Sequence, residues 1–276
     1  MMGTGGFTEL RVVSPAAWLA RDLSNQDVIP VAGDIGLWAP KQWRHLAWWM
    51  PGSHAARLAA SGVHPRLQTP GWAALSMFDT SVLGRQVSAV QLQHLEEFGG
   101  EHFVKPADVK VEALPASMTT GEAFLRAAQD AGMPSDLPVL VSDPVNFTHE
   151  YRCFIASGQV VAASAYLIEG STWGAWHPAD LPPTEDAVAF ATDAAAQLKM
   201  PHLPGGWVLD VGLIDARQWA VVETNPAWCS NPYWSTEGDA TGVVRAILAA
   251  QGDAPAPALQ WQGPQRHTPA GPLPRR

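Results

Sequence analysis

Residues 207–225 read WVLDVGLIDARQWAVVETN and have the pattern of two β-strands joined by a tight turn. Apolar residues, many of them β-branched or aromatic, fill most of Val208–Ile214 and Trp219–Asn225, and the polar run Asp215–Gln218 separates them. Two such runs around a short polar segment predict a β-hairpin. The hairpin is informative because acidic residues lie inside its apolar strands.

The register of this hairpin decides how its two acids are placed. The pairs that follow from a turn at Asp215–Gln218 are Ile214–Trp219, Gly212–Val221 and Asp210–Glu223. Asp210 and Glu223 are then cross-strand neighbours, with Cβ atoms roughly 4.5–5.5 Å apart. Opposed carboxylates destabilise a sheet unless a shared proton, a Lys or Arg side chain, or a divalent cation offsets their repulsion.

Strand alternation adds a third polar group to this face. Asn225 lies two residues beyond Glu223 and therefore on the same side of the sheet. Asp210, Glu223 and Asn225 together form an all-oxygen set, which suits Mg²⁺ or Mn²⁺ rather than zinc. The alternative is a surface hairpin that carries two incidental acids.

Three cations precede the hairpin at positions that suit anion binding. Lys105 ends an expected strand just before Pro106, Lys110 follows five residues later, and Arg152 opens an expected first hairpin. A lysine in a cleft at a strand end binds phosphate as a point charge, and a long basic side chain on a strand can reach into such a cleft. The alternatives are solvated lysines and an arginine paired with a surface acid.

The composition narrows the class of protein. The chain has 276 residues, 47% of them hydrophobic and 16% charged, and its formal net charge is −9, with eighteen acidic and seven basic side chains in residues 101–250. Such a chain folds, and its acidity argues against nucleic acid as a partner. No run is long and apolar enough to predict a membrane span. Two distant cysteines exclude a disulfide scaffold and favour the reducing cytoplasm.

Local patterns outline the remaining elements. We expect strands at Leu10–Val13, Val28–Val31, His102–Pro106 and Pro138–Ser142, a hairpin from Tyr151 to Leu167 with its turn at Ser157-Gly158, and helices at Trp38–Met50, 86–99, Thr120–Ala131, Glu185–Lys199 and Asp239–Gln251. Residues 252–276 are rich in proline and lack apolar periodicity, which predicts a flexible tail.

The order of these motifs resembles the ATP-grasp superfamily. The segments that carry the resemblance are Val104-Lys105-Pro106, Leu140–Val145, Glu150-Tyr151-Arg152, Leu209–Gly212 and Val222–Asn225. They cover roughly residues 101–250, and the set is most similar to the branch that includes the ribosomal-protein glutamate ligases. The resemblance implies an α+β fold in which two lobes clasp ATP, preceded by a small α/β lobe. The implied domains are residues 1–85, an ATP-grasp domain at 86–251, and the tail at 252–276.

The resemblance also implies a reaction and a site. ATP and Mg²⁺ (or Mn²⁺) activate a small-molecule or peptide carboxylate as an acyl phosphate, and an amine then attacks to form an amide. Carried over by position, Lys105 and Lys110 contact phosphates, the hinge with Ser142, Asp143 and Val145 receives adenine, Glu150 lies near the ribose or phosphates, Arg152 lies near the γ-phosphate or acyl phosphate as the catalytic cation, and Asp210, Glu223 and Asn225 hold the metal.

The chain departs from the family pattern in one respect and leaves several alternatives open. The first ATP-binding lysine of the family has no clear counterpart, and Arg85 is a candidate substitute. Trp228 and Tyr233 either line the substrate pocket or belong to the core. An ATP-binding regulatory module without ligase turnover and a small-molecule kinase are the competing functions. The expected assembly is a monomer or a homodimer.

Overall fold

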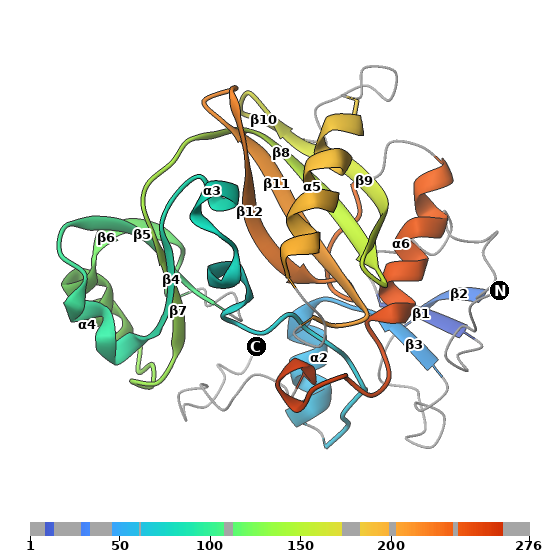
Figure 1. Ribbon diagram of the computed structural model, residues 1–276. Coiled ribbons are helices and arrows are strands. Elements are labelled where there is room, and N and C mark those ends of the chain that lie inside the picture. Colours follow the sequence, from blue (N-terminus) through green and yellow to red (C-terminus); the bar gives the residue numbers. More distant parts are fainter. Residues whose placement is uncertain are drawn as a thin grey trace. The chain divides into compact units, whose positions relative to one another are not determined.

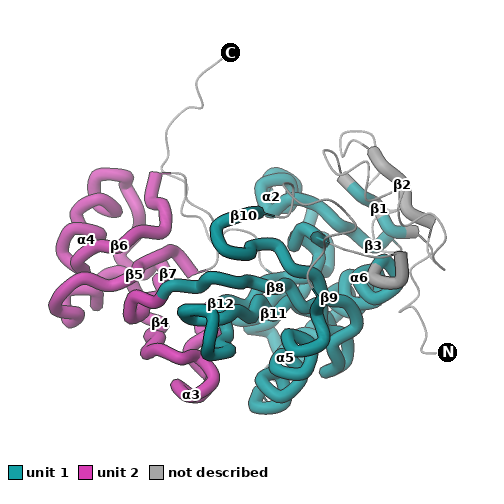
Figure 2. Tube along the Cα trace, turned by 90° about the horizontal axis from the view of Figure 1, so that it is seen from above, with its two compact units in different colours: residues 1–71, 146–263 teal, residues 72–145, 264–276 magenta. Residues whose placement is uncertain are grey.

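The computed structural model of the chain describes residues 9–13, 29–33, 46–60, 62–107, 113–172, 183–198, 203–233 and 237–261. They divide into two compact units, coloured separately in Figure 2. Unit 1 comprises residues 1–71 and 146–263, and unit 2 comprises residues 72–145 and 264–276. In sequence, unit 2 therefore interrupts unit 1. Within the described ranges, no helix has the length and apolar character needed to cross a membrane.

Unit 2 is built on a four-stranded antiparallel sheet with the strand order β4-β7-β5-β6 (Figure 1). Its elements are η3 (Ala74–Met77), α3 (Thr80–Leu83), β4 (Val87–Gln91), η4 (Leu92–Glu97), β5 (Glu101–Pro106), β6 (Ser117–Thr120), α4 (Gly121–Asp130) and β7 (Pro138–Ser142). Helix α4 packs against η4, β5 and β6. The core that joins them includes Leu95, Val104, Phe124, Val139 and Val141.

The predicted helix at Thr120–Ala131 is confirmed together with its end signals. Thr120 Oγ1 accepts a hydrogen bond from the Ala123 main-chain N–H at 3.2 Å, as an N-cap does. Gly132 takes the left-handed conformation with φ of 68°, which ends the helix. Both signals are local in sequence, so neighbouring residues suffice to predict them.

The predicted helix over residues 86–99 is wrong in its first half. Val87–Gln91 form strand β4, and only Leu92–Glu97 are helical, as a 3₁₀ segment. All five residues of β4 are half-buried, and the strand pairs with β7 from Val87–Ser142 to Gln91–Pro138. Pairing with a strand about fifty residues away therefore overrides the local preference.

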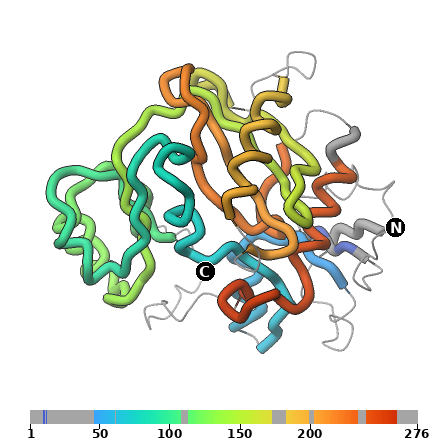
Figure 3. Tube along the Cα trace, in the orientation of Figure 1, coloured from blue at the N-terminus to red at the C-terminus, as the bar shows by residue number. Residues whose placement is uncertain are grey.

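Unit 1 contains a five-stranded antiparallel sheet with the order β10-β9-β8-β11-β12 (Figures 1 and 3). Its strands are β8 (Phe147–Ala156), β9 (Gln159–Ile168), β10 (Ser171–Thr172), β11 (Gly206–Ile214) and β12 (Gln218–Pro226). Both predicted hairpins are confirmed. Ser157 and Gly158 both have positive φ, as a two-residue turn between twisted strands requires.

Two helices cover this sheet from opposite faces. In α5 (Glu185–Gln197) the ring of Phe190 stacks on Trp219, which also contacts Tyr151. Helix α6 (Glu237–Ala249) shares a core with Phe154 and Val208. Because Tyr151 and Phe154 are an odd number of residues apart on β8, they point to opposite faces. Arg152 and Asp210 therefore share the α6 face with the apolar side chains that α6 covers.

Glycines allow α6 to lie unusually close to the sheet. A Cβ atom added to Gly242 would overlap the carbonyl oxygen of Val161 in β9. Gly206, the first residue of β11, meets the carbonyl oxygen of Ala246 in the same way. The main chains of α6 and the sheet thus touch at two points, with no side chain between them.

The N-terminal part of unit 1 forms a parallel sheet with the order β2-β1-β3, followed by α2 (Gly52–Ala60). Its strands are β1 (Glu9–Val13), β2 (Ile29–Gly33) and β3 (Leu46–Trp49). The expected strand at Leu10–Val13 is confirmed. The expected helix at Trp38–Met50 is wrong for β3, and residues 38–45 lie outside the described residues. All four residues of β3 are buried, and a strand buried on both faces reads as a continuous apolar run without alternation.

A buried glutamine joins β3 to the residue that follows helix α6. Gln251 Oε1 accepts a hydrogen bond from the Trp48 main-chain N–H at 2.7 Å. Its Nε2 group donates to the main-chain oxygens of Trp48 and Ile247, each at 3.0 Å. Gln251 therefore satisfies main-chain groups on two elements that are about two hundred residues apart in sequence.

Replacing Gln251 with leucine should lower the free energy of unfolding by about 2–4 kcal/mol, because two or three buried main-chain groups lose their partners at roughly 1–3 kcal/mol each. Urea unfolding followed by tryptophan fluorescence measures the change. Gln93→Leu, at an exposed position of η4, is the matched control and should change stability by less than about 0.5 kcal/mol. Equal stability of the two variants would contradict the structural role of Gln251.

The packed part of unit 1 extends beyond Gly252, where the sequence predicted the start of a flexible tail. Residues 252–261 include η7 (Pro257–Leu259), and Gln260 forms a β-bridge with Gln68. The ring of Trp261 meets that of Trp228 edge-on at 5.5 Å between centroids. These ten residues therefore belong to the folded unit, and residues 262–276 lie outside the described residues.

Candidate functional site

The two acids of the second hairpin face each other as the sequence predicted. Asp210 of β11 and Glu223 of β12 are paired in the strand register. Asp210 is completely buried, and Glu223 is partly exposed. The pairing predicted for these carboxylates is confirmed.

A β-bulge follows this pair immediately. The register shifts by one residue between Asp210 and Val211, so that Val222 is the additional residue on β12. The predicted pairs Gly212–Val221 and Ile214–Trp219 are therefore wrong by one residue. A bulge bends its strand and increases the local twist, so the acids sit where the hairpin changes direction.

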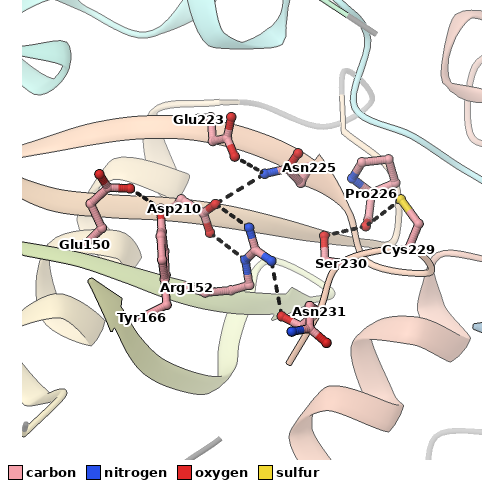
Figure 4. Close-up of polar contacts among 10 residues, drawn as sticks. All are labelled: Glu150, Arg152, Tyr166, Asp210, Glu223, Asn225, Pro226, Cys229, Ser230 and Asn231. Atoms are coloured by element: carbon pink, nitrogen blue, oxygen red, sulfur yellow. Dashed lines mark hydrogen bonds and ion pairs between the residues drawn. The ribbon is translucent and has the colours of Figure 1, made fainter. Parts of the chain in front are cut away.

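Arg152 is the cationic partner of Asp210 (Figure 4). It lies on β8 directly opposite Asp210 across the β8–β11 ladder. Its Nε–H donates to Oδ1 of Asp210 at 2.9 Å, and its Nη2–H donates to Oδ2 at 2.7 Å. Its Nη1–H donates to the main-chain oxygen of Asn231 at 3.1 Å. Three N–H groups of the guanidinium are thus directed by fixed acceptors.

Asn225 connects the two carboxylates. Its Nδ2 group donates to Oδ2 of Asp210 at 3.2 Å and to Oε1 of Glu223 at 2.8 Å. The three predicted metal ligands are therefore neighbours on one face. In this arrangement the amide nitrogen, rather than the amide oxygen, points toward the acids (Figure 4).

Two tyrosines complete the surroundings of Arg152. The guanidinium carbon lies 5.4 Å from the ring centroid of Tyr166 and 5.1 Å from that of Tyr233, and the two rings stack with centroids 5.2 Å apart. The hydroxyl of Tyr166 donates a hydrogen bond to Glu150. Burial, together with the negative charges of Asp210 and Glu150, raises the pKa of Tyr166 well above its ordinary value.

The loop after β12 holds the remaining contacts in place. Trp228 is buried, its Nε1–H donates to the Gln68 main-chain oxygen at 2.8 Å, and its own carbonyl accepts from the Met50 N–H at 2.9 Å. Of the two interpretations that the sequence left open, Trp228 belongs to the core. Tyr233, from the same loop, lies beside Arg152.

The electrostatics of the cluster leave it with an excess of negative charge. Burial raises the pKa of Asp210 to about 6; the nearby Glu223 acts in the same direction, and Arg152 opposes it. Burial disfavours the charged form of Arg152, but Asp210 outweighs this and raises the pKa of the guanidinium above its ordinary value. With Glu150 included, three carboxylates surround one guanidinium.

Both cysteines lie near this cluster, and both are free. Burial raises the pKa of Cys153 far above its ordinary value and that of Cys229 to about 12. Because only the thiolate is nucleophilic, iodoacetamide at pH 8 should alkylate both thiols at least about a hundredfold more slowly in the native protein than in urea. Peptide mass spectrometry over time measures this, and labelling of Cys229 in the native protein at the rate of the unfolded chain would contradict it.

The predicted nucleotide-binding residues of unit 2 lie on and beside one sheet. Lys105 of β5 faces Leu140 of β7, and Ser142 is the last residue of β7. Asp143 N–H donates to the Gln86 main-chain oxygen at 3.1 Å, and its carboxylate accepts from the Gln86 N–H at 3.1 Å. These contacts tie the end of β7 to the start of β4. Val145 is half-buried after this point, and Lys110 lies outside the described residues.

Lys105 shares its face of the sheet with exposed apolar side chains. Phe103 lies two residues before Lys105 on β5 and is paired with Met118 of β6. Phe103 is 38% exposed and Met118 is 48% exposed, which makes them two of the few large apolar side chains on the described surface. Val104, on the opposite face, is buried under α4. The Lys105 face thus combines a cation with open apolar surface.

The structure thus brings Glu150, Arg152, Asp210, Glu223 and Asn225 together in unit 1, and Lys105, Ser142, Asp143 and Val145 lie in unit 2. Arg85 is buried, and its guanidinium donates to the Leu83 main-chain oxygen at 2.9 Å. Sequence reasoning missed Tyr166 and Asn231 as neighbours of Arg152. The alternation of β9 places Tyr166 near this face, but nothing local marks a main-chain carbonyl such as that of Asn231.

The donor set of the cluster fits a hard divalent cation. Asp210, Glu223 and the amide oxygen of Asn225 are the ligand types that Mg²⁺ prefers, and the excess negative charge would be balanced by two positive charges. Among the described residues no cluster of three or more His, Cys, Asp or Glu side chains is arranged for a metal. A magnesium site in the described part of the chain therefore depends on the amide as its third protein ligand.

The comparisons agree with this picture of the fold. Residues 82–243 match the family model of an ATP-grasp domain, clade family 2. None of the curated proteins matches the chain significantly. The crystal structure of the D-cycloserine synthetase DcsG is similar with a TM-score of 0.58 at 16% identity, over 87% of this chain and 98% of that chain.

Two further solved structures are more distant. An ATP-grasp RimK domain protein from Sphaerobacter thermophilus aligns with a TM-score of 0.49 at 12% identity, over 88% of this chain and 99% of that one. A D-alanine–D-alanine ligase from Bacillus anthracis aligns with a TM-score of 0.42 at 11% identity, over 79% and 86%. The predicted α+β ATP-grasp fold is confirmed by the family model and by DcsG. Because the family model covers more than half of the chain, this protein belongs to the ATP-grasp domains of clade family 2.

Proposed function

We propose that this protein is an ATP- and Mg²⁺-dependent carboxylate–amine ligase. In the proposed reaction the terminal phosphoryl group of ATP passes to a carboxylate, and an amine then displaces phosphate from the acyl phosphate to give an amide, ADP and phosphate. Membership of the ATP-grasp family supports the use of ATP. The arrangement of acids and cation in unit 1 supports phosphoryl transfer, which depends mainly on positioning and charge neutralisation.

The observation that carries this proposal is the opposed pair Asp210–Glu223 with Asn225 beside it and Arg152 bound to Asp210. A buried carboxylate facing a second carboxylate is costly unless positive charge is supplied. Asp210, Glu223 and Asn225 would hold the metal. When bound, the metal would neutralise phosphate oxygens and polarise the transferred group.

The other residues divide by the part of the nucleotide that they would meet. Lys105 and Lys110 would bind phosphates as point charges, and Arg152 would stabilise the γ-phosphate or the acyl phosphate through its planar fork. Ser142, Asp143 and Val145 would receive adenine at the end of β7. Glu150 would lie near the ribose or the phosphates.

The substrates would be a small-molecule or peptide carboxylate and an amine acceptor. We also propose that the protein acts in the cytoplasm, where thiols such as Cys153 and Cys229 stay reduced. Neither nucleic acid nor a membrane is expected as a partner, and the enzyme would act as a monomer or a homodimer.

A coupled assay of ADP release over a panel of carboxylates and amines tests the proposal. Substrate-dependent ADP release, with the acyl phosphate trapped as a hydroxamate by hydroxylamine, is the expected result. Tight ATP binding with no ADP formed from any mixture would instead identify a nucleotide-binding module without turnover. A stable phosphorylated product that hydroxylamine does not trap would identify a small-molecule kinase.

A further inference from the structure

Both oxygens of the Asp210 carboxylate already have a cationic partner. Arg152 engages Oδ1 at 2.9 Å and Oδ2 at 2.7 Å through two parallel hydrogen bonds. Arg152 is only 8% exposed, and Asp210 has no exposed surface. A bidentate pair removed from water is strong and directional, because each ion has given up its hydration for the other. The charge of Asp210 is therefore compensated by the chain itself.

Other groups keep the guanidinium in this position. The main-chain oxygen of Asn231 accepts from Nη1 at 3.1 Å, on the far side from Asp210. The rings of Tyr166 and Tyr233 lie 5.4 and 5.1 Å from the guanidinium carbon, within cation–π range. Acceptors and rings thus surround Arg152, so its contact with Asp210 is built into the site rather than being one of many solvent-exposed rotamers.

The opposite side of Asp210 is also occupied by donors. Asn225 Nδ2 donates to both Asp210 and Glu223, at 3.2 and 2.8 Å. A divalent cation that seeks the oxygens of these residues meets N–H groups on the Asn225 side and a guanidinium on the Arg152 side. Of the two acids, Glu223 is the more exposed, so the resident cation acts mainly on the buried one.

We propose that Arg152 is a resident counter-ion that competes with divalent metal for Asp210, and that a polyphosphate ligand strengthens metal binding by engaging the guanidinium. The identity of the metal site in this proposal rests on the proposed function. Two cations that share one carboxylate weaken each other's binding, and this coupling is reciprocal. Free metal should therefore bind poorly, and an anion that engages Arg152 should improve metal binding.

Binding of Mn²⁺ alone tests this competition without any turnover. Free Mn²⁺ is counted by electron paramagnetic resonance in titrations of the full chain without nucleotide. Arg152→Gln should bind Mn²⁺ about tenfold more tightly than the wild type, within the usual range of coupling between two ligands. Arg217→Gln, at the exposed turn of the same hairpin, removes one positive charge without touching Asp210 and should bind like the wild type.

A second variant covers the case in which Arg152→Gln fails to fold. Arg152→Lys keeps the positive charge next to Asp210 but cannot form the planar fork, so Mn²⁺ binding should tighten by a smaller factor. Circular dichroism confirms folding of each variant. A folded variant at position 152 that binds Mn²⁺ no more tightly than the wild type overturns the competition. So does a wild-type dissociation constant for Mn²⁺ alone below about 10 µM, typical of dedicated cation sites.

Failure of this inference can be distinguished from failure of the proposed function. If the wild type does not bind Mn²⁺ and ATP together, the proposed ATP-dependent function is wrong. If it binds both, and the Arg152 variants do not tighten the binding of Mn²⁺ alone, only the competition is wrong.

Discussion

Replacing Asp210 with asparagine should abolish metal-dependent ATP binding and ADP formation. Asp210 supplies the buried charge on which the proposed metal site depends, and asparagine keeps its size while removing that charge. We expect metal affinity in the presence of ATP to fall at least about a hundredfold, equivalent to roughly 2.7 kcal/mol. Glu223→Gln should cost about tenfold, because Glu223 is partly exposed and water can replace some of its interactions.

The measurement is a calorimetric titration of each variant with Mg²⁺ and a non-hydrolysable ATP analogue, together with the ADP assay. The matched control is Asp215→Asn at the turn of the same hairpin. Asp215 is exposed with φ of 48°, a conformation that asparagine tolerates well, so this variant should behave like the wild type. Normal binding of Mg²⁺ and the nucleotide by both Asp210→Asn and Glu223→Gln would show that these acids do not hold the metal.

Replacing Gly242 with alanine should prevent unit 1 from folding stably. The new Cβ atom would overlap the main-chain carbonyl oxygen of Val161 and lie 2.9 Å from the Cβ atom of Ala162. Neither is the flexible end of a side chain, so relief requires α6 to move away from β9. That movement would open the core around Phe154 and Val208. We expect a loss of about 3 kcal/mol or more, a large part of the stability of an ordinary domain.

Thermal unfolding and the yield of soluble protein measure this effect. Gly52→Ala, in helix α2, is the control because nothing lies within 4 Å of the Cβ position and its φ is not left-handed. Alanine there should leave stability unchanged or raise it slightly, since it reduces the freedom of the unfolded chain. A Gly242→Ala protein as stable as Gly52→Ala would mean that α6 is not held as close to the sheet as described.

The sequence predicted features that depend on neighbouring residues. The turn at Ser157-Gly158, the cap at Thr120 and the pairing of Asp210 with Glu223 each depend on residues no more than about fifteen positions apart. The bulge at Val222 was not predicted, because strict alternation has no place for an extra residue. The opposed acids were still paired correctly, since the bulge lies on the turn side of them.

Contacts between distant segments were beyond local reasoning. The sequence left open whether a shared proton, a basic side chain or a metal offsets the two acids, and the register of β8 against β11 puts Arg152 opposite Asp210. No turn connects these strands, so the sequence offered no register to count. Strand β3 was mistaken for part of a helix because its four consecutive buried residues show no period of two.

The topology of unit 1 has a consequence for synthesis on the ribosome. Residues 46–71 find their partners in Trp228, Gln251 and Gln260, which are translated more than 150 positions later. The early segment therefore leaves the exit tunnel with its tryptophans uncovered, while the whole of unit 2 is made before the covering residues appear. During that interval Trp48 and Trp49 are exposed to chaperones and to aggregation, and release from both depends on the arrival of the last helix.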